Sequence, residues 1–144
     1  MRDIIIFTMG NDTYKNLLEM AKEASKKSYS PYSNFPVGAC VLYESGRTYQ
    51  GCNVENVSYG LSLCAERNAI SSAIAQGEKT KIKAIAIFCP KQNMCLPCGA
   101  CRQWISEFCI SQDDTKIVME NHNKEVEVLK LGDIFPFGFK IENE

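Results

Sequence analysis

The 144-residue chain contains a single histidine, His122, and this scarcity excludes several kinds of catalytic site. A Ser-His-Asp triad, a Cys-His nucleophile pair or a histidine-rich metal centre would each have to use that one residue. His122 lies in an apparent turn between two predicted strands, where a histidine is more often a solvated loop residue than a catalyst. The sequence therefore predicts chemistry that does not depend on imidazole.

The chain also lacks a strong charge imbalance and any long apolar run. Its formal net charge is −1, which offers no electrostatic footprint for a polynucleotide, so we expect no nucleic-acid partner. The apolar run Ile4–Phe7 is too short for a signal-peptide core or a membrane span. We therefore expect no membrane association and a cytoplasmic location.

Cysteine, in contrast, is abundant, with eight residues in the chain. In a reducing compartment thiols serve as metal ligands, small core residues or redox groups rather than as a disulfide framework. Four of them have apolar surroundings and are interpreted as small core residues, namely Cys40, Cys52, Cys89 and Cys109. The remaining four, Cys64, Cys95, Cys98 and Cys101, are the candidates for metal ligation.

No internal repeat, low-complexity tract or linker divides the sequence, so we expect a single domain over residues 1–144, with residues 1–10 as an N-terminal extension that resembles nothing we can place. Apolar periodicity predicts helices at about 14–28, 64–76 and 98–108, and strands at 37–43, 48–53, 83–89, 115–119 and 125–129. The predicted fold is α/β, a three-layer α-β-α arrangement around a mixed, five-stranded sheet.

Two segments carry the candidate ligands, and each opens a predicted helix. Cys98 and Cys101 are three residues apart, which on a helix brings their Cβ atoms to about 5–6 Å on one face. That spacing suits two sulfurs bound to one zinc ion at about 2.3 Å each. The chain between Cys64 and Cys98 is long enough for a helix, a strand and a return to the same sheet edge. Three protein ligands would leave one zinc position for water, as in catalytic sites.

Spacing alone leaves other interpretations open. A C-x-x-C pair also occurs in redox pairs and in structural zinc knuckles. Cys95 lies three residues before Cys98, so a closed Cys₄ site that only holds the fold is possible. Two features favour the open site: Pro97 turns Cys95 away from the shared helix face, and Glu66, two residues after Cys64, has no structural task in a closed site.

Four linked motifs resemble those of the small, homotetrameric zinc-dependent cytidine deaminases. They are the segments Phe35–Ala39, Asn53–Asn56, Cys64–Arg67 and Pro97–Gln103, and the likeness runs from about residue 29 to 108 in the same order and spacing. Zinc deaminases are known to combine a Pro-C-x-x-C segment with a glutamate that is not a ligand. The resemblance implies a cytidine deaminase-like fold and hydrolysis of cytidine or 2′-deoxycytidine to the uridine form and ammonia. It also implies pyrimidine salvage, one zinc per subunit and active sites shared within a homotetramer.

The resemblance assigns a role to each matching residue. Cys64, Cys98 and Cys101 would hold the zinc, and Glu66 would relay a proton from water to the ring and then to the leaving ammonia. Substrate contacts are implied for Phe35 against the nucleoside, Asn53 and Glu55 at the ribose hydroxyls, the Ala65 backbone and Leu96 carbonyl at the pyrimidine edge, and Phe139 on the base in a neighbouring subunit's site. Tyr59 resembles a residue at the subunit contact.

The charge of the expected metal centre raises a further point, because three thiolates and Zn²⁺ together carry one negative charge. Two helix N-termini would withdraw part of that charge from the sulfurs. The resemblance assigns further charge tuning to Arg67 through a hydrogen bond to sulfur, and Arg102 is predicted to be a structural ion-pair partner. Val57 and Leu96 depart from the family's usual alanine and serine, and Val57 is expected to add bulk near the sugar pocket.

Three rival functions follow from the same residues. A related deaminase could act on a nucleoside-like antibiotic, although the Asn53–Asn56 segment argues against it. A deaminase of RNA or DNA conflicts with the acidic balance of the chain. A non-catalytic, zinc-stapled interaction module would require Cys95 as a fourth ligand and would be indifferent to the loss of Glu66.

Overall fold

The structure is a computed structural model and describes residues 10–142. The predicted N-terminal extension therefore lies outside the described residues, apart from Gly10. Gly10 has an extended conformation and caps the first described helix, α2 (Asn11–Ser25), whose amide groups at Thr13 and Tyr14 donate to the Gly10 carbonyl. This helix begins three residues before the predicted start at about residue 14.

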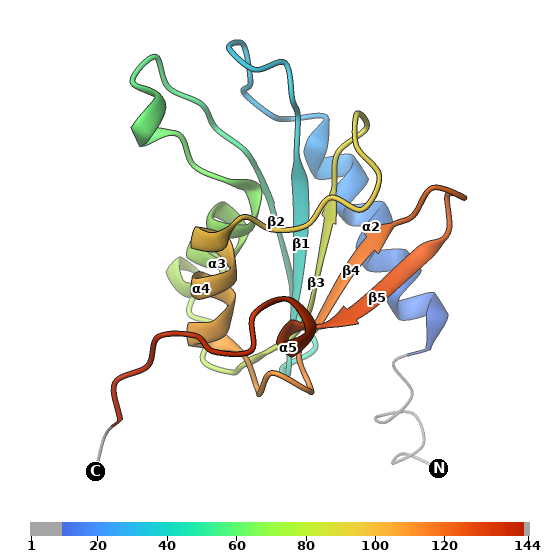
Figure 1. Cartoon of the computed structure of the whole chain (residues 1–144), viewed down its shortest axis with the longest axis vertical. Helices are drawn as coiled ribbons and strands as arrows, with labels where there is room; N and C mark the ends of the chain where they lie inside the picture. The colour runs from blue at the N-terminus through green and yellow to red at the C-terminus, as the bar shows by residue number, and fades with distance from the viewer. Residues whose placement is uncertain (1–9, 143–144) are drawn as a thin grey trace.

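A five-stranded sheet forms the centre of the molecule, in the order β2-β1-β3-β4-β5 (Figure 1). The strands are β1 (Gly38–Tyr43), β2 (Thr48–Cys52), β3 (Ile82–Phe88), β4 (Lys116–Glu120) and β5 (Val126–Lys130). Only β3 and β4 pair in parallel within this sheet, and the other neighbours are antiparallel. The prediction of a mixed, five-stranded sheet is confirmed.

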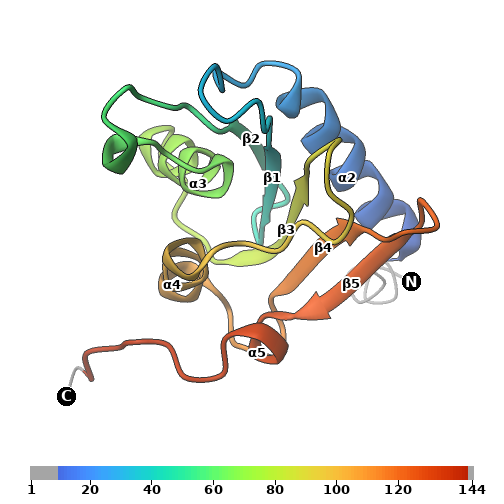
Figure 2. The same cartoon turned by 45° about the horizontal axis from the view of Figure 1, so that its top comes forward.

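Helices cover both faces of this sheet (Figure 2). Helix α2 packs on one face, and α3 (Ala65–Ala75) and α4 (Gly99–Phe108) pack on the other. Strand β1 shows why both faces can be covered, because its successive side chains point to opposite sides. Val41 and Tyr43 belong to the core beneath α3 and α4, whereas Cys40 and Leu42 face α2. The predicted three-layer arrangement is confirmed.

Two glycines let the helices approach the sheet closely. A Cβ atom on Gly38 would lie 2.0 Å from the carbonyl oxygen of Ala21 in α2. A Cβ atom on Gly51 would lie 2.4 Å from the amide nitrogen of Ala69 and 2.5 Å from the carbonyl oxygen of Ala65, both in α3. Only glycine fits at either contact, so these two positions set how far each helix stands from the sheet.

The structure corrects several sequence expectations. Helix α2 ends at Ser25 rather than near Ser28, because residues 26–28 continue in tighter turns whose amides bond three residues back. The short helices η1 (Tyr59–Leu61) and α5 (Leu131–Ile134) were not predicted, since each is too brief to show a periodic pattern. Cys40, Cys89 and Cys109 are buried as expected, but Cys52 is only half-buried at the end of β2, where its Sγ contacts the Lys27 carbonyl oxygen at 3.5 Å.

Candidate metal centre and active site

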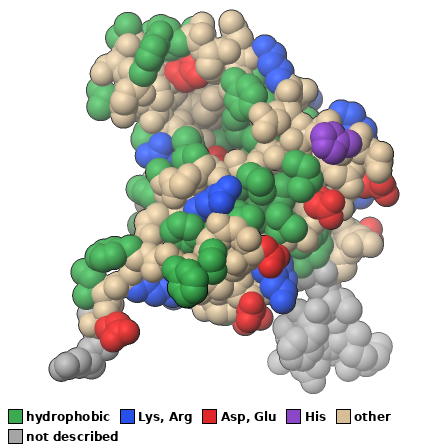
Figure 3. Space-filling view, in the orientation of Figure 1, with side chains coloured by type: hydrophobic (Ala, Val, Ile, Leu, Met, Phe, Trp, Pro, Cys, Tyr) green, Lys and Arg blue, Asp and Glu red, His purple; other side chains and the backbone are tan. Residues whose placement is uncertain are grey.

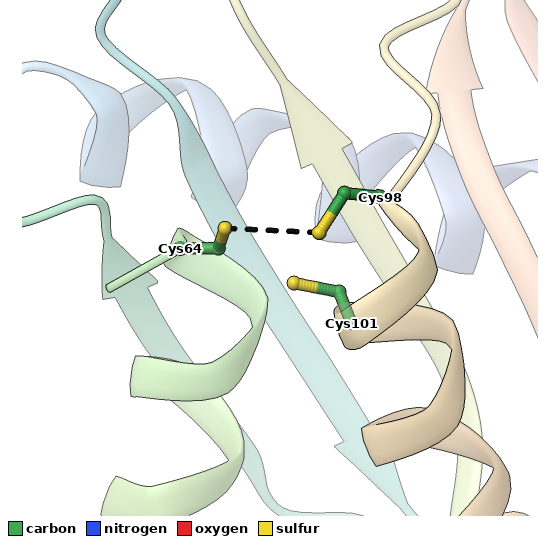
Figure 4. A group of neighbouring side chains, drawn as sticks. All are labelled: Cys64, Cys98 and Cys101. Atoms are coloured by element: carbon green, nitrogen blue, oxygen red, sulfur yellow. Dashed lines mark hydrogen bonds between the residues drawn. The ribbon is translucent and has the colours of Figure 1, made fainter. Parts of the chain in front are cut away.

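Three cysteines from two helix starts form the centre of the site. Cys64 is the N-cap of α3, Cys98 is the N-cap of α4, and Cys101 lies in the first turn of α4. Their Sγ atoms all lie within 4.8 Å of one another, with 4.0 Å between Cys64 and Cys98, and Figure 4 shows the three sulfurs directed at one another. Three sulfurs bound tetrahedrally to one zinc ion would be about 3.8 Å apart. The donor type and the spacing therefore fit zinc.

Helix geometry and one arginine stabilise negative charge on these sulfurs. The N-termini of α3 and α4 both lie at the three-sulfur cluster, because Cys64 and Cys98 occupy their N-cap positions. The positive ends of the two helix dipoles therefore stabilise negative charge on the sulfurs. Nη2 of Arg67 lies 3.5 Å from Sγ of Cys64. A hydrogen bond from Cys101, together with the Arg67 guanidinium, lowers the pKa of the Cys64 thiol to about 5. Hydrogen bonding to Cys64 and burial raise the pKa of the Cys101 thiol in turn.

Cys95 does not join this group. Within residues 10–142 the only cluster of potential metal ligands consists of Cys64, Cys98 and Cys101. Cys95 is buried in the core beneath α3 and α4 and forms part of a cavity wall, and burial raises the pKa of its thiol to about 12. The described residues therefore form a three-cysteine site, as the position of Pro97 had suggested, and not the closed four-cysteine alternative.

Glu66 is the acidic group of the site. It lies in the first turn of α3, next to Ala65, and its side chain is only 4% exposed. Burial raises the pKa of its carboxyl to about 7, and the negative charge of Cys64 acts in the same direction. A carboxyl group with such a pKa can both accept and donate a proton near neutral pH. Sequence reasoning placed Glu66 beside the ligands, but not its near-complete burial.

A cavity of about 540 Å³ opens beside the three cysteines. It brings together most of the predicted site residues, namely Phe35, Asn53, Glu55, Cys64, Ala65, Glu66, Leu96 and Cys98. Of the described residues that line it, none is a lysine, an arginine or a histidine, and the charged ones are Glu55 and Glu66. Ser33 also lines the cavity and was missed, although its place two residues before Phe35 in a polar loop was a signal that could have found it.

Asn53 has most of its hydrogen-bonding capacity already used. Its Oδ1 accepts from the amide of Val37 at 2.9 Å and from the hydroxyl of Ser28. Its Nδ2 donates to the carbonyl of Phe35 at 2.9 Å. A primary amide has two N–H donors and an oxygen with two lone pairs. One N–H of Asn53 is therefore left to donate at the cavity wall.

Glu55 complements Asn53, because it keeps a free hydrogen-bond acceptor where Asn53 keeps a free donor. One carboxylate oxygen accepts from the amides of Tyr32 and Ser33 at 3.0 and 3.1 Å, and the other accepts from the hydroxyl of Ser33. The hydroxyl of Ser33 is the main cause that lowers the pKa of this carboxyl, so it stays ionised at neutral pH. With two bonds on one oxygen and one on the other, Glu55 keeps an acceptor position free.

Four predictions about flanking residues have different outcomes. Phe139 is 72% exposed and lines a separate cavity, so the described chain does not bring it to its own active site. Val57 is 76% exposed and is not among the residues that line the main cavity, so added bulk near the sugar pocket stays a prediction. Arg102 makes no ion pair with any described carboxylate; its guanidinium donates to backbone carbonyls instead, which corrects the ion-pair prediction. Tyr59 is 75% exposed, and its place at a subunit contact stays a prediction.

His122 lies on an exposed turn, with its Nδ1 at 3.3 Å from Nδ2 of Asn93, which agrees with a loop residue. In residues 10–142, no helix is both apolar enough and long enough to span a bilayer.

Comparison with known proteins gives consistent matches over most of the chain. The family described as "Cytidine and deoxycytidylate deaminase zinc-binding region" matches residues 11–120. A cytidine deaminase of Sporosarcina psychrophila is 37% identical over 129 residues, which are 90% of this chain and 93% of that protein. The crystal structure of a cytidine deaminase from Burkholderia pseudomallei superposes with a TM-score of 0.78 at 42% identity, covering 87% of this chain and 98% of that one. For the cytidine deaminase from Mycobacterium tuberculosis the TM-score is 0.75 at 36% identity, covering 89% and 98%.

Proposed function

Because this chain belongs to the cytidine and deoxycytidylate deaminase family defined by its zinc-binding region, we propose that it hydrolyses cytidine and 2′-deoxycytidine to uridine and 2′-deoxyuridine. Water replaces the amino group at C4 of the ring, and ammonia leaves. The observation that carries the proposal is the three-cysteine cluster, of which Cys64 and Cys98 line a cavity that is also lined by the buried Glu66.

The residues divide the chemistry between them. Cys64, Cys98 and Cys101 would hold the zinc ion, whose Lewis acidity activates water for attack. Glu66 would accept one proton from the attacking water and deliver it to N3 of the ring. It would then accept the second proton of that water, from the hydroxyl now bonded to C4, and deliver it to the amine, which leaves as ammonia. A pKa of about 7 matches both tasks, because the same group must be a base and then an acid within one turnover. Its burial next to Ala65 keeps bulk water from competing for that proton.

The pyrimidine ring would lie in the apolar part of the cavity. Phe35 provides a face for the nucleoside, and the backbone of Ala65 and the carbonyl of Leu96 provide polar contacts for the edge of the ring. All three residues line the cavity. Since the contact from Leu96 uses the backbone, its departure from the family's usual serine leaves this contact available.

The unused groups of Asn53 and Glu55 fit one sugar hydroxyl. A hydroxyl can accept from the free N–H of Asn53 and donate to the free acceptor position of Glu55. One secondary hydroxyl satisfies both groups, so cytidine and 2′-deoxycytidine are both suitable substrates. A substrate without that hydroxyl would leave a charged acceptor and an amide unpaired.

The charge of the cavity favours a nucleoside over a nucleotide. Its charged side chains are carboxylates, and no described cation lines it to receive a phosphate group. The net charge of −1 gives a polynucleotide no basic surface either. We infer a small, uncharged nucleoside substrate, and we propose pyrimidine salvage as the physiological role.

We also propose that the chain assembles as a homotetramer with shared active sites. Large apolar side chains are exposed on the 57–61 segment and on the C-terminal segment, namely Val57, Tyr59, Leu61, Phe137, Phe139 and Ile141. Figure 3 shows hydrophobic side chains gathered along the C-terminal segment at the lower left. Burial in an assembly would remove this surface from water. A cytoplasmic location is proposed as well, because it would keep the ligand thiols reduced.

The decisive experiment compares zinc content and ammonia release from cytidine for the wild type and Glu66→Gln. The amide keeps the size of the side chain but cannot accept the proton, so turnover should fall by at least about 10²-fold while zinc content stays the same. Glu23→Gln, at an exposed site on α2, is the matched control and should retain full activity. Equal turnover by Glu66→Gln and the wild type would refute the proposal and favour a non-catalytic zinc module. Parallel assays on aminonucleoside antibiotics distinguish cytidine deamination from the activity of a related deaminase that acts on such antibiotics.

A second prediction concerns the sugar. We expect cytidine and 2′-deoxycytidine to have kcat/KM values within about tenfold of each other, and 2′,3′-dideoxycytidine to be slower by about 10²-fold or more. The reason is that only the dideoxy substrate leaves Asn53 and Glu55 without a hydroxyl partner. Steady-state kinetics on the three substrates measure the ratios, and similar values for all three would contradict the assignment of these two residues.

A further inference from the structure

Arg102 connects the ligand turn of α4 to the C-terminal segment. It directly follows the ligand Cys101, and its Nε donates to the carbonyl of Pro97 at 2.7 Å. Its Nη1 donates to the carbonyl of Ile134, the last residue of α5, at 2.8 Å. The guanidinium is partly buried and has no carboxylate partner among the described residues, so its contacts here are with backbone.

The position of Pro97 makes this contact relevant to the metal centre. Pro97 directly precedes Cys98, the N-cap ligand, and Arg102 also donates its own amide to the Cys98 carbonyl at 2.9 Å. Arg102 therefore holds the turn that carries Cys98 through two contacts, one from its side chain to Pro97 and one from its backbone amide to Cys98. A displacement of this turn would move the sulfur of Cys98 relative to those of Cys64 and Cys101.

Gln103 holds the same C-terminal segment at a second point. Its Nε2 donates to the carbonyl of Phe139 at 3.0 Å, and its Oε1 accepts from the amide of Phe139 at 2.9 Å. This pair of bonds imitates the contact between neighbouring strands. Two consecutive residues that follow a ligand thus fix the segment 134–139, and the buried side chain of Leu131 anchors its beginning in the core.

We propose that Arg102 is a positioning residue for the metal centre, and that the C-terminal segment 131–139, held by Arg102 and Gln103, determines how firmly the chain retains zinc. The proposal rests on the three-cysteine zinc site but not on the nucleoside chemistry. A guanidinium suits this role because its fixed fork reaches two carbonyls at once, which an ammonium group cannot do with the same geometry. Partners that orient metal ligands typically change metal affinity by about 10–100-fold when they are replaced.

The test measures zinc release from the full-length, zinc-loaded protein into an excess of a chromogenic chelator, at a temperature where circular dichroism shows the fold intact. Arg102→Lys should release zinc about tenfold faster than the wild type or more. Arg47→Lys is the matched control, because Arg47 lies exposed in the turn between β1 and β2, and its release rate should equal that of the wild type. After cobalt substitution, the sulfur-to-cobalt absorption bands of Arg102→Lys should shift, which a general loss of stability would not produce.

Gln103→Glu provides an independent variant, because it removes the donor to the Phe139 carbonyl and leaves Arg102 unchanged. It should also accelerate zinc release, by a smaller factor than Arg102→Lys. If Arg102→Lys does not fold, Gln103→Glu decides the question alone. Release rates at the wild-type value for the folded variants would overturn the proposal. Since the assay uses no substrate, its outcome is separate from that of the deamination experiment.

Discussion

At the scale of single residues, the site works because a few side chains have their hydrogen-bonding capacity almost filled. Asn53 and Glu55 each retain one free position after holding the loops that surround them. Arg67 differs, because it directs Nη2 at the sulfur of Cys64, at 3.5 Å, while its buried Nε has no hydrogen-bond partner among the described residues. Asn53 and Glu55 position the backbone and, in the proposed function, also contact the sugar, so a change at either residue would affect both.

Replacement of Arg67 by glutamine is expected to slow turnover without loss of zinc. The three sulfurs remain, but the positive charge beside Cys64 is gone, so more electron density stays on the metal and its Lewis acidity falls. We expect kcat to fall by about tenfold or more. Metal analysis and steady-state kinetics on cytidine measure the two effects.

Arg47→Gln is the control for the Arg67 substitution, since it removes the same charge from an exposed turn. It should match the wild type in both zinc content and kcat. Unchanged turnover of Arg67→Gln with a full complement of zinc would show that this arginine has no role in tuning the metal.

The sequence predicted the ligand residues well and their surroundings less well. Cysteine is a distinctive residue type, so the spacing of Cys64, Cys98 and Cys101 was enough to indicate a metal site. The free positions of Asn53 and Glu55 depend on loops that close over them from distant parts of the chain, and no local pattern encodes such contacts. Arg102 was misjudged for the same reason, because its carbonyl partner at Ile134 lies in a short helix that periodicity does not reveal.

At the scale of elements, the distances of α3 and α4 from the sheet decide whether the three sulfurs meet, because these two helices carry them. Strands β1 and β3 were predictable because their apolar runs are long. Gly77, with φ at +91°, follows the C-cap residue Gln76 and ends α3. The close approach of α3 at Gly51 was not predictable, because a glycine in a strand has several possible causes. Its consequence is specific, however, since α3 carries Cys64 at its N-cap and Glu66 in its first turn.

Gly51→Ala and Gly38→Ala form a matched pair that tests this link. Each adds a methyl group against the backbone of a helix, α3 in the first case and α2 in the second, so each should lower the free energy of unfolding by about 1–3 kcal/mol or more. Only Gly51→Ala moves the helix that carries site residues. It should therefore also accelerate zinc release and lower kcat, whereas Gly38→Ala should retain both values in its folded fraction.

Urea titration, chelator competition and steady-state kinetics on the two glycine variants provide the three measurements. An equal loss of activity in both variants at equal stability would show that the distance between α3 and the sheet has no specific effect on the active site.

At the scale of the whole molecule, the described chain leaves large apolar side chains exposed on two segments. Tyr59 and Leu61 are exposed on one side, and Phe137 and Phe139 on the C-terminal segment. A chain with a net charge of −1 has little electrostatic repulsion to keep copies apart. Both features agree with the proposed homotetramer.

A subunit-mixing experiment tests the proposal that Phe139 completes a neighbour's site. Glu66→Gln and Phe139→Ala should each be impaired alone. Assemblies formed by mixing the two should regain activity, because a subunit with intact Glu66 can receive an intact Phe139 from its neighbour. Ammonia release is measured before and after mixing.

The mixing control pairs Phe139→Ala with the double variant Glu66→Gln and Phe139→Ala. Neither chain then carries Phe139, so no activity should be regained. Activity of the first mixture equal to the average of its two components would show that the sites are not shared.

The closeness of the three sulfurs also affects how readily the site is oxidised. A thiolate attacked by peroxide becomes a sulfenic acid, and a second thiol nearby can condense with it to a disulfide. Cys64, Cys98 and Cys101 lie within 4.8 Å of one another, so damage at one would readily spread to the next. A bound zinc ion would occupy the sulfur electron pairs that otherwise attack peroxide. The same three sulfurs that suit a metal ion are therefore also suited to disulfide formation when no metal holds them.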